Sequence, residues 1–444
     1  MCSAPSLNVL FRTYQPLHPH HIMSNSTPES PPASIHILNK ANYSKHTTLT
    51  LPASPLPPLP PSSIRLRPRI LGLTTNNLTY ARHGHLMGWY DIYPLPPATP
   101  APYNDTSTYG RIAAWGYADI VESNVDGVRS GMSVYGFLPI STGIETITVE
   151  LAADKNGDVI PHQIIATDGH RQHLWKIYNR YQICASISTL EATRTQDSLG
   201  LDALMQGLFA TGYNLSTYAF APSSAARIHP SGTGPWSTED ADLNGAGIVI
   251  LNASGKTGMS FAYALRKCRH VSEQPALIVG VGSDKSVDAI TKSGLYDKVF
   301  SNSDAGKAKD FLGNNEVKRI ILLDFGARPA TLPTWQHSLS SPIPFTLITI
   351  GGEVKVQDPE TAKKRLAELG TTILVNASAL RERGIECGGE EYFRGFYEKW
   401  EGARGVFGGS LGLEWGEGVE GWEGGWERLC GDGVGAGVGL VYRV

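Results

Sequence analysis

The sequence predicts an α/β protein in which a compact β domain is followed by a parallel β-sheet with crossover helices. Short apolar runs alternate with helical segments between residues 248 and 350, which is typical of a parallel sheet. A glycine-rich turn joins the first of these runs to a helix. Earlier, the apolar runs between residues 112 and 142 are broken by glycines, as in strands joined by tight turns.

The length of the chain predicts more than one domain. Its 444 residues are too many for one average core, so two domains and poorly ordered ends are expected. Residues 1–33 are rich in Pro, Ser and His and predict a disordered tail. We expect the β domain over residues 34–195 and the parallel-sheet domain over residues 196–352. Residues 353–444 are then expected to return to the β domain.

The β domain is expected from a series of short strands. Residues 34–38 predict a first strand, and the proline-dense residues 52–61 predict a semi-rigid extended connector. Residues 64–73 alternate apolar and basic side chains, as a half-buried strand does. The glycine-broken runs up to residue 142 complete the expected domain.

The parallel-sheet domain is expected from five strands and two helices. The strands are predicted at residues 248–251, 276–281, 298–300, 319–324 and 345–350, and the helices at residues 259–267 and 285–292. After it, residues 402–439 mix Gly, Glu and Trp without a clear period and predict a loose segment over which Trp415, Trp422 and Trp426 pack. Residues 439–442 predict a closing strand.

The turn after the first strand of the parallel sheet has the layout of a dinucleotide-binding turn. Its small residues let the backbone approach a pyrophosphate that lies on the helix N-terminus, so the expected domain is of the Rossmann type. Gly351, which closes the fifth strand, is a further candidate for cofactor binding. The candidates in the turn itself are Ala253, Ser254, Gly255, Lys256, Thr257 and Gly258.

Two other interpretations of this turn compete with a dinucleotide site. Gly255-Lys256-Thr257 is similar to the end of the phosphate loop of ATPases and GTPases, but that motif needs a glycine where Ile250 stands inside the strand. A tight strand-to-helix turn without any ligand stays open, because a lone glycine pattern is weak evidence.

Composition and charge exclude several classes of protein. The net charge is -3 and Lys and Arg are scattered, so no basic field for nucleic acid is expected. No apolar run approaches the ~18 residues of a membrane span, and the N-terminus lacks the apolar core of a secretory signal. A cytoplasmic protein without membrane attachment is expected. Its five cysteines are widely spaced, which favours reduced thiols over disulfides or structural zinc.

Several motifs resemble, in order and spacing, those of one enzyme superfamily. They are Tyr80-Ala81-Arg82-His83-Gly84, Gly116 to Glu122, Gly131 to Gly136, Leu208 to Tyr213, Ala253 to Gly258 and Asp324-Phe325-Gly326. Together they resemble the medium-chain dehydrogenase/reductase superfamily, and its zinc-free quinone and enone reductases above all. A further set is similar to an uncharacterised family within it, a domain of unknown function: Asn76 to Ala81, Trp115 to Asp119 and Tyr178 to Tyr181.

The resemblance implies both a fold and an activity. The fold would be a GroES-like β domain joined to a Rossmann-type domain. The activity would be the NADPH-dependent reduction of an activated C=C bond or a quinone in a small-molecule substrate, and a homodimer is an assembly that the resemblance allows. Zinc-dependent members carry Gly-His-Glu where this chain has Gly116-Tyr117-Ala118. No cysteine lies between Cys2 and Cys184, so no metal is expected.

Without zinc, a reductase needs a group that stabilises or protonates the developing enolate. Tyr80 is the catalytic candidate, with packing at a strand end as the alternative. Cofactor choice points to NADP, because Val281 stands where NAD enzymes tend to place an acid. Ser283 and Lys285 would hold the 2′-phosphate, unless Lys285 only faces solvent. The alternative is a catalytically silent protein of this fold that binds a nucleotide or a partner protein. The glycines named above do not distinguish it from a reductase, because both would have them.

Overall fold

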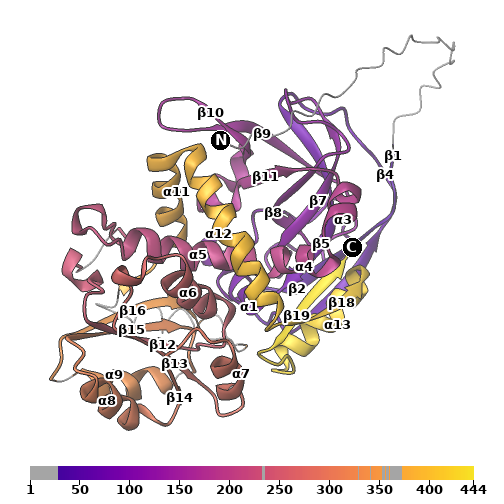
Figure 1. Ribbon diagram of the computed structural model, residues 1–444. Helices are drawn as coiled ribbons and strands as arrows, with labels where there is room; N and C mark the ends of the chain where they lie inside the picture. Colours follow the sequence, from indigo (N-terminus) through magenta and orange to yellow (C-terminus); the bar gives the residue numbers. More distant parts are fainter. Residues whose placement is uncertain are drawn as a thin grey trace, which may run out of the picture.

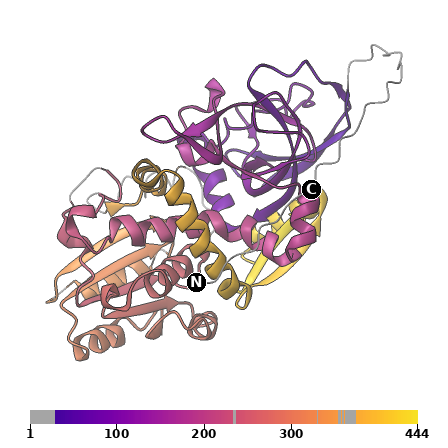
Figure 2. The ribbon, with the colours of Figure 1, turned by 45° about the horizontal axis from the view of Figure 1, so that its top comes forward.

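The structure is a computed structural model, and it describes residues 29–232, 236–328, 330–340, 342–352 and 373–444, with the single residues 356 and 360. Figure 1 shows two lobes, one built on antiparallel strands and one on a parallel sheet flanked by helices. Helix α12 (Glu390–Gly408) runs between them, and it keeps this position in the turned view of Figure 2. Among the described residues, no helix has the length and apolar character needed to cross a membrane.

The β domain is a sheet of eight strands that closes on itself. Strand β5 pairs with β7 on one side and with β9 on the other, and β19 pairs with its C-terminal half. The strand order is β18-β19-β5-β7-β8-β11-β10-β9. The bounds are β5 (Ser63–Leu73), β7 (Ala113–Ser123), β8 (Ser133–Pro139), β9 (Glu145–Ala153), β10 (Val159–Ala166), β11 (Arg180–Cys184), β18 (Gly412–Glu417) and β19 (Val438–Arg443).

A small sheet lies beside this domain at the N-terminal end of the described chain. It has the order β3-β2-β6, and the strand expected at residues 34–38 falls within β2. Residues 1–28 of the expected tail lie outside the described residues, whereas Glu29–Ser30 form β1, which pairs with β4 inside the expected proline-rich connector. The remaining bounds are β2 (Ala33–Asn39), β3 (His46–Leu51), β4 (Ser54–Pro55) and β6 (Tyr109–Gly110).

The second domain is a parallel sheet with the order β14-β13-β12-β15-β16-β17. The order reverses between β12 and β15, and open sheets of this kind bind ligands at such a switch point. All five expected strands are present, and β17 extends the sheet past residue 352, where the domain was expected to end. The bounds are β12 (Ala246–Leu251), β13 (Leu277–Gly282), β14 (Lys298–Ser301), β15 (Arg319–Phe325), β16 (Phe345–Gly351) and β17 (Ile373–Leu374).

Helices cover the sheet and connect the two domains. A long helical stretch leads from the β domain into β12, and it contains two π-helical turns at residues 202–206 and 215–219. The helices of the parallel-sheet domain are α5 (Gly207–Asn214), α6 (Lys256–Lys267), α7 (Val287–Lys292), α8 (Ala305–Asn314), α9 (Thr331–Leu339) and α11 (Ala377–Gly388). Helix α4 (Gln196–Leu201) begins the connecting stretch and packs against β5 of the β domain. In the β domain lie α1 (Thr75–Arg82), α2 (Gly84–Met87) and α3 (Ile187–Thr193).

The C-terminal segment is not loose, which corrects the sequence-based expectation. It forms a β18-α13-β19 unit, with α13 at Gly418–Cys430 and the two strands parallel. Val419, Trp422, Trp426 and Leu429 are buried on one face of α13. Their spacing of three and four residues is helical, but glycines and glutamates between them hide it in the sequence. The packing role expected for Trp422 and Trp426 agrees with their burial, while Trp415 on β18 is partly exposed.

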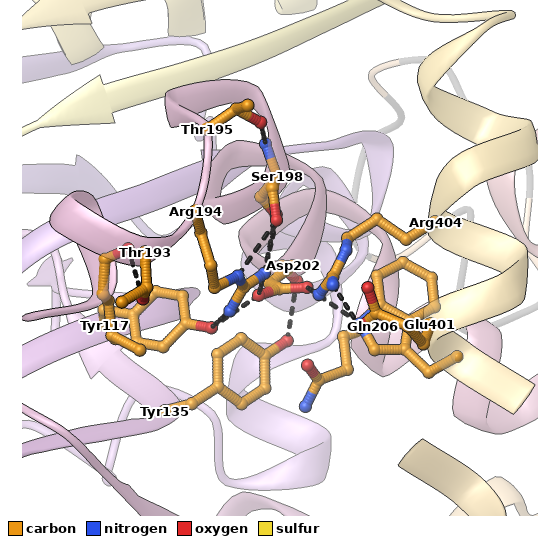
Figure 3. Close-up of polar contacts among 12 residues, drawn as sticks. Tyr117, Tyr135, Thr193, Arg194, Thr195, Ser198, Asp202, Gln206, Glu401 and Arg404 are labelled. Atoms are coloured by element: carbon orange, nitrogen blue, oxygen red, sulfur yellow. Dashed lines mark hydrogen bonds and ion pairs between the residues drawn. The ribbon is translucent and has the colours of Figure 1, made fainter. Parts of the chain in front are cut away.

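A buried carboxylate joins the parts of the molecule (Figure 3). Asp202 is 1% exposed, at the start of the first π-helical turn. It accepts a hydrogen bond from the Tyr117 hydroxyl of β7 at 2.6 Å and from the Trp400 indole of α12 at 2.8 Å. Arg404 of α12 contacts it at 3.0 Å, and Arg194 pairs with it from the other side. The β domain, the connecting helix and α12 therefore share one charged centre.

Candidate functional site

A cavity of about 510 Å³ lies at the carboxyl ends of the parallel strands. Its walls come from the turns after β12, β13 and β15, the end of β14, the start of α1 and the loop between α13 and β19. The lining residues are Leu73 to Thr75, Asn252, Ser254 to Lys256, Gly282, Ser283, Lys285, Ser286, Asn302, Gly326 to Arg328, Leu429, Asp432 to Ala436 and Val438. It coincides with the switch point of the sheet, the expected place for a ligand.

The glycine-rich turn is held by its own first residue. Asn252 adopts a left-handed φ of 58°, which Asn tolerates better than most residues. Its amide Nδ2 donates to the Phe325 carbonyl at 3.0 Å, and its carbonyl accepts from the Gly255 N–H at 2.9 Å. Gly255 is the N-cap of α6, and a Cβ added there would lie 2.8 Å from Asn252 Nδ2. At Gly255 the turn thus exposes the start of α6 to the cavity without a side chain.

Lys256 is the first residue of α6, and its ammonium points back under the C-terminal loop. Nζ donates to the Val438 carbonyl at 3.3 Å. Burial lowers the pKa of Lys256 to about 8, and no charged neighbour offsets it. A cation at a helix N-terminus also faces the positive end of the helix dipole. The cavity therefore holds a poorly compensated positive charge.

The end of β13 forms the adjacent wall. Ser283 caps the following turn, because its carbonyl accepts from the N–H groups of Ser286 and Val287. Its hydroxyl donates to the Ser286 hydroxyl at 3.1 Å. Lys285 and Asp284 are both exposed, and Lys285 lines the cavity whereas Asp284 does not. A ligand phosphate beside β13 would meet one hydroxyl and one cation here.

The end of β15 brings a further cation. The Asp324 carboxylate accepts from the N–H groups of Gly326 and Ala327 at 3.0 and 2.7 Å, which fixes the turn. Arg328 follows, and its Nη2 lies 3.4 Å from the Asp432 carboxylate in the C-terminal loop. Both groups are about half exposed, so this pair is worth little in stability.

The structure brings five of the predicted cofactor residues together at the cavity: Ser254, Gly255, Lys256, Ser283 and Lys285. Four others lie beside it rather than in its lining. Ala253 is fully buried and receives the Tyr296 hydroxyl on its carbonyl at 2.8 Å. Thr257 and Gly258 follow in α6, and Gly351 packs against the backbone of Phe325.

Tyr80, the predicted catalytic residue, lies on α1 inside an aromatic cluster. Its hydroxyl accepts a hydrogen bond from the Trp115 indole at 3.1 Å. Its ring packs edge-on against Trp89, Phe137 and Tyr178, with centroid distances of 4.9, 4.9 and 5.9 Å. Burial raises the pKa of Tyr80, against hydrogen bonds from Trp115, Tyr178 and Asn76. Tyr80 is 4% exposed and is not among the residues that line the cavity.

Asn77, from the family motif Asn76 to Ala81, belongs to the backbone framework at the start of α1. Asn77 Oδ1 accepts from the Thr74 N–H at 2.8 Å, and Nδ2 donates to the Ala113 carbonyl at 3.1 Å. In the described part of the chain, His, Cys, Asp and Glu side chains nowhere gather in groups of three or more that could hold a metal ion.

The closed antiparallel sheet followed by a six-stranded parallel sheet defines the medium-chain dehydrogenase/reductase fold, with a GroES-like and a Rossmann-type domain. The family described as "Protein of unknown function (DUF2855)" matches residues 71–435, and the chain belongs to this family. No curated protein matches it in sequence. The fold and the family expected from the sequence motifs are confirmed.

Solved structures with the same fold are remote in sequence. A point mutant of Etr1p, in complex with NADP and crotonyl-CoA, has a TM-score of 0.53 at 10% identity, over 94% of this chain and 100% of that chain. CurA from Vibrio vulnificus, in complex with NADPH, has a TM-score of 0.51 at 11% identity, over 93% and 99%. Mycobacterial Rv1454c, complexed with NADPH, has a TM-score of 0.50 at 14% identity, over 93% of this chain and 100% of that chain. Identities this low establish the fold alone.

The sequence-based prediction missed the far wall of the cavity. The loop at residues 431–437 reads Gly-Asp-Gly-Val-Gly-Ala-Gly, and it lies opposite the glycine-rich turn although about 180 residues separate them. Its alternating glycines were a signal for close backbone approach to a ligand. Arg328 had no such signal, because its position depends on the turn that Asp324 fixes.

Proposed function

We propose that this protein is an NADPH-dependent oxidoreductase that reduces an activated C=C bond or a quinone by hydride transfer without a metal. The observation that carries the proposal is the cavity, where the N-terminus of α6 meets Lys256, Lys285 and Arg328. This combination suits an anionic dinucleotide. Etr1p, CurA and Rv1454c were solved with NADP or NADPH, which supports the same cofactor here.

The residues at the cavity have separate roles in this proposal. Gly255 and the first N–H groups of α6 hold the pyrophosphate, while Ser283 and Lys285 hold the 2′-phosphate. The bound dinucleotide supplies the hydride. Asp284 opposes a phosphate only if it turns inward, and its side chain is exposed.

Tyr80 is proposed to hold the proton that balances the reaction. Because burial raises its pKa, the phenol stays protonated at neutral pH and remains a hydrogen-bond donor for an enolate. A metal-free reaction agrees with Tyr117, which stands where zinc enzymes carry histidine and donates its hydroxyl to Asp202. The proposal includes a small-molecule substrate, a cytoplasmic location and a homodimer.

One observation favours the second candidate, a catalytically silent nucleotide-binding protein. Aromatic rings enclose Tyr80, and it does not line the cavity. A silent protein would bind NADPH but would not transfer its hydride to any acceptor.

Two measurements test the proposal in turn. Fluorescence titration should show tighter binding of NADPH than of NADH, and Lys285→Met should remove that preference. Oxidation of NADPH in the presence of a panel of quinones and enones should then identify an acceptor. Binding without turnover on any acceptor would favour the silent protein, and equal affinity for both cofactors would contradict the roles of Ser283 and Lys285.

A further inference from the structure

Two cations of the cavity are held by oxygens of one loop and of the residue that follows it. We call this loop the strap (residues 431–437 between α13 and β19). Asp432 in the strap pairs with Arg328, and the Val438 carbonyl at its end accepts from Lys256. Arg328 follows β15 and Lys256 begins α6, so both belong to the parallel-sheet domain. The strap belongs to the β domain, and it thus bridges the two domains across the cavity.

The strap is built for close approach. Four of its seven residues are glycines, so little side-chain volume projects from it. Asp432 has a left-handed φ of 59° directly after α13, and the Gly433 N–H donates to the Arg428 carbonyl at 2.8 Å. On the far side, the Gly412 N–H donates to the Gly437 carbonyl at 2.9 Å. Both ends of the strap are therefore anchored, while its middle lies against the cavity.

Lys256 lacks the counter-charge that its position calls for. Among the described residues, its ammonium donates to one neutral carbonyl at 3.3 Å and pairs with no carboxylate. The side chain is partly buried and lies at the positive end of a helix, and both features disfavour a cation. A dianionic group at the start of α6 would supply the missing charge.

We propose that Lys256 and the strap form a clamp for the pyrophosphate of the dinucleotide, in which Lys256 leaves the Val438 carbonyl and binds a phosphate oxygen. This inference rests on the proposed function. Asp432 and Arg328 hold the strap against the parallel-sheet domain in the absence of ligand. The strap then covers the pyrophosphate from the side opposite α6.

The clamp predicts how pH affects binding. The charged groups around the cavity are Lys256, Lys285, Arg328 and Asp432, and burial lowers the pKa of Lys256 to about 8. A bound pyrophosphate stabilises the ammonium, so binding above that pKa requires proton uptake. The affinity for NADPH should therefore fall as pH rises from 7.5 to 9.5, and Lys256→Met should flatten this dependence.

The test compares dissociation constants of NADPH and NADH for variants of the full chain by fluorescence titration at pH 7. Lys256→Met should weaken both cofactors about 10- to 100-fold, because a charge-assisted bond to a group common to both is lost. Lys256→Arg, which keeps the charge, should restore most of the affinity. Lys309→Met, an exposed lysine on α8, is the matched control and should bind as the wild type does. Thermal melting checks that each variant is folded.

Hydrogen exchange provides the readout for the strap itself. NADPH should slow the exchange of the amides at residues 431–437 in the wild type and have a smaller effect in Lys256→Met. If the wild type binds NADPH and Lys256→Met binds it equally well, the clamp is wrong and the proposed function stands. If the wild type binds neither dinucleotide, both fail.

Discussion

Gly255 is the residue at which the proposed cofactor site should be most sensitive to added volume. Its N–H closes the turn on the Asn252 carbonyl, and a Cβ would already lie 2.8 Å from Asn252 Nδ2. We expect Gly255→Val to weaken NADPH and NADH binding by two orders of magnitude or more, about 2.7 kcal/mol, because the side chain blocks the approach of the pyrophosphate. Titration with both cofactors measures this.

The matched control for this variant is Gly306→Val on α8. A Cβ at Gly306 meets no atom within 4 Å, so this change should leave both affinities as they are. Circular dichroism should show that the β domain of Gly255→Val is still folded. Normal cofactor binding by Gly255→Val would mean that the turn is only a structural link between β12 and α6.

Removal of the Tyr80 hydroxyl alone distinguishes a catalytic role of this residue from a packing role. If its hydroxyl stabilises the enolate, Tyr80→Phe should lower turnover by roughly 10²-fold while cofactor affinity stays near that of the wild type. The ring keeps its contacts with Trp89 and Phe137, so the fold should be preserved. Steady-state kinetics on an accepted substrate decides the point. Unchanged turnover would leave Tyr80 with packing alone.

Between elements, the contact of β2 and β3 with α13 contains a titratable pair. His36 on β2 is 1% exposed, and its Nε2 lies 3.1 Å from Nδ1 of His46 on β3. Its ring packs at 5.7 Å from the Trp426 ring of α13. Burial, and next the charge of His46, lower the pKa of His36 to about 3. The folded chain therefore keeps this histidine neutral under conditions in which the unfolded chain protonates it.

The pH dependence of stability follows from that difference. Above pH 6.5, the pKa of His36 in the unfolded chain, this histidine is neutral in both the folded and the unfolded chain. The contact then contributes its full stability. As the pH falls from 6.5 towards 3, the unfolded chain binds one more proton than the folded chain, which costs about 1.4 kcal/mol per pH unit. Denaturant unfolding from pH 7 to 4 should show this slope, and His36→Gln should lose it. An identical slope in the variant would assign the acid sensitivity to other groups.

At the scale of the whole molecule, Asp202 holds the domains and α12 together. Replacement of the carboxylate would leave Arg194 and Arg404 facing each other across the junction without their shared counter-charge. We expect Asp202→Asn to reduce the free energy of unfolding by about 3 kcal/mol, as when one partner of a buried ion pair is removed. Chemical denaturation followed by tryptophan fluorescence measures it, since Trp400 contacts the same carboxylate.

An exposed pair supplies the comparison. Glu386→Gln breaks an ion pair with Arg383, in which the Glu386 side chain is 50% and the Arg383 side chain 57% exposed. It should lower the free energy of unfolding by less than about 1 kcal/mol. If Asp202→Asn is no more destabilising than Glu386→Gln, the junction is not a point of strong coupling. A change in cofactor affinity without a change in stability would indicate that Asp202 sets the angle between the domains instead.

The sequence determined the parts of this protein in which local pattern and tertiary environment agree. The central strands β12, β13 and β15 of the parallel sheet are buried along almost their whole length, so each appears as a continuous apolar run such as Ile248 to Leu251. The turn at Ser254 to Lys256 is short and local, and in the structure it lines the cavity at the switch point. The motifs also led to the fold and the family, because their order along the chain follows the order of the domains.

Only the tertiary structure decided what residues far apart in the chain build together. The helix α13 escaped prediction, since its buried face is carried by widely spaced Trp422 and Trp426 among glycines of low helix propensity. The strap and Arg328 meet through folding alone, at a sequence separation of about 100 residues. The centre at Asp202 likewise draws on three elements. Buried charged groups are stable only when they are paired, and their partners can come from any part of the chain. A local sequence pattern therefore does not show which residues will pair.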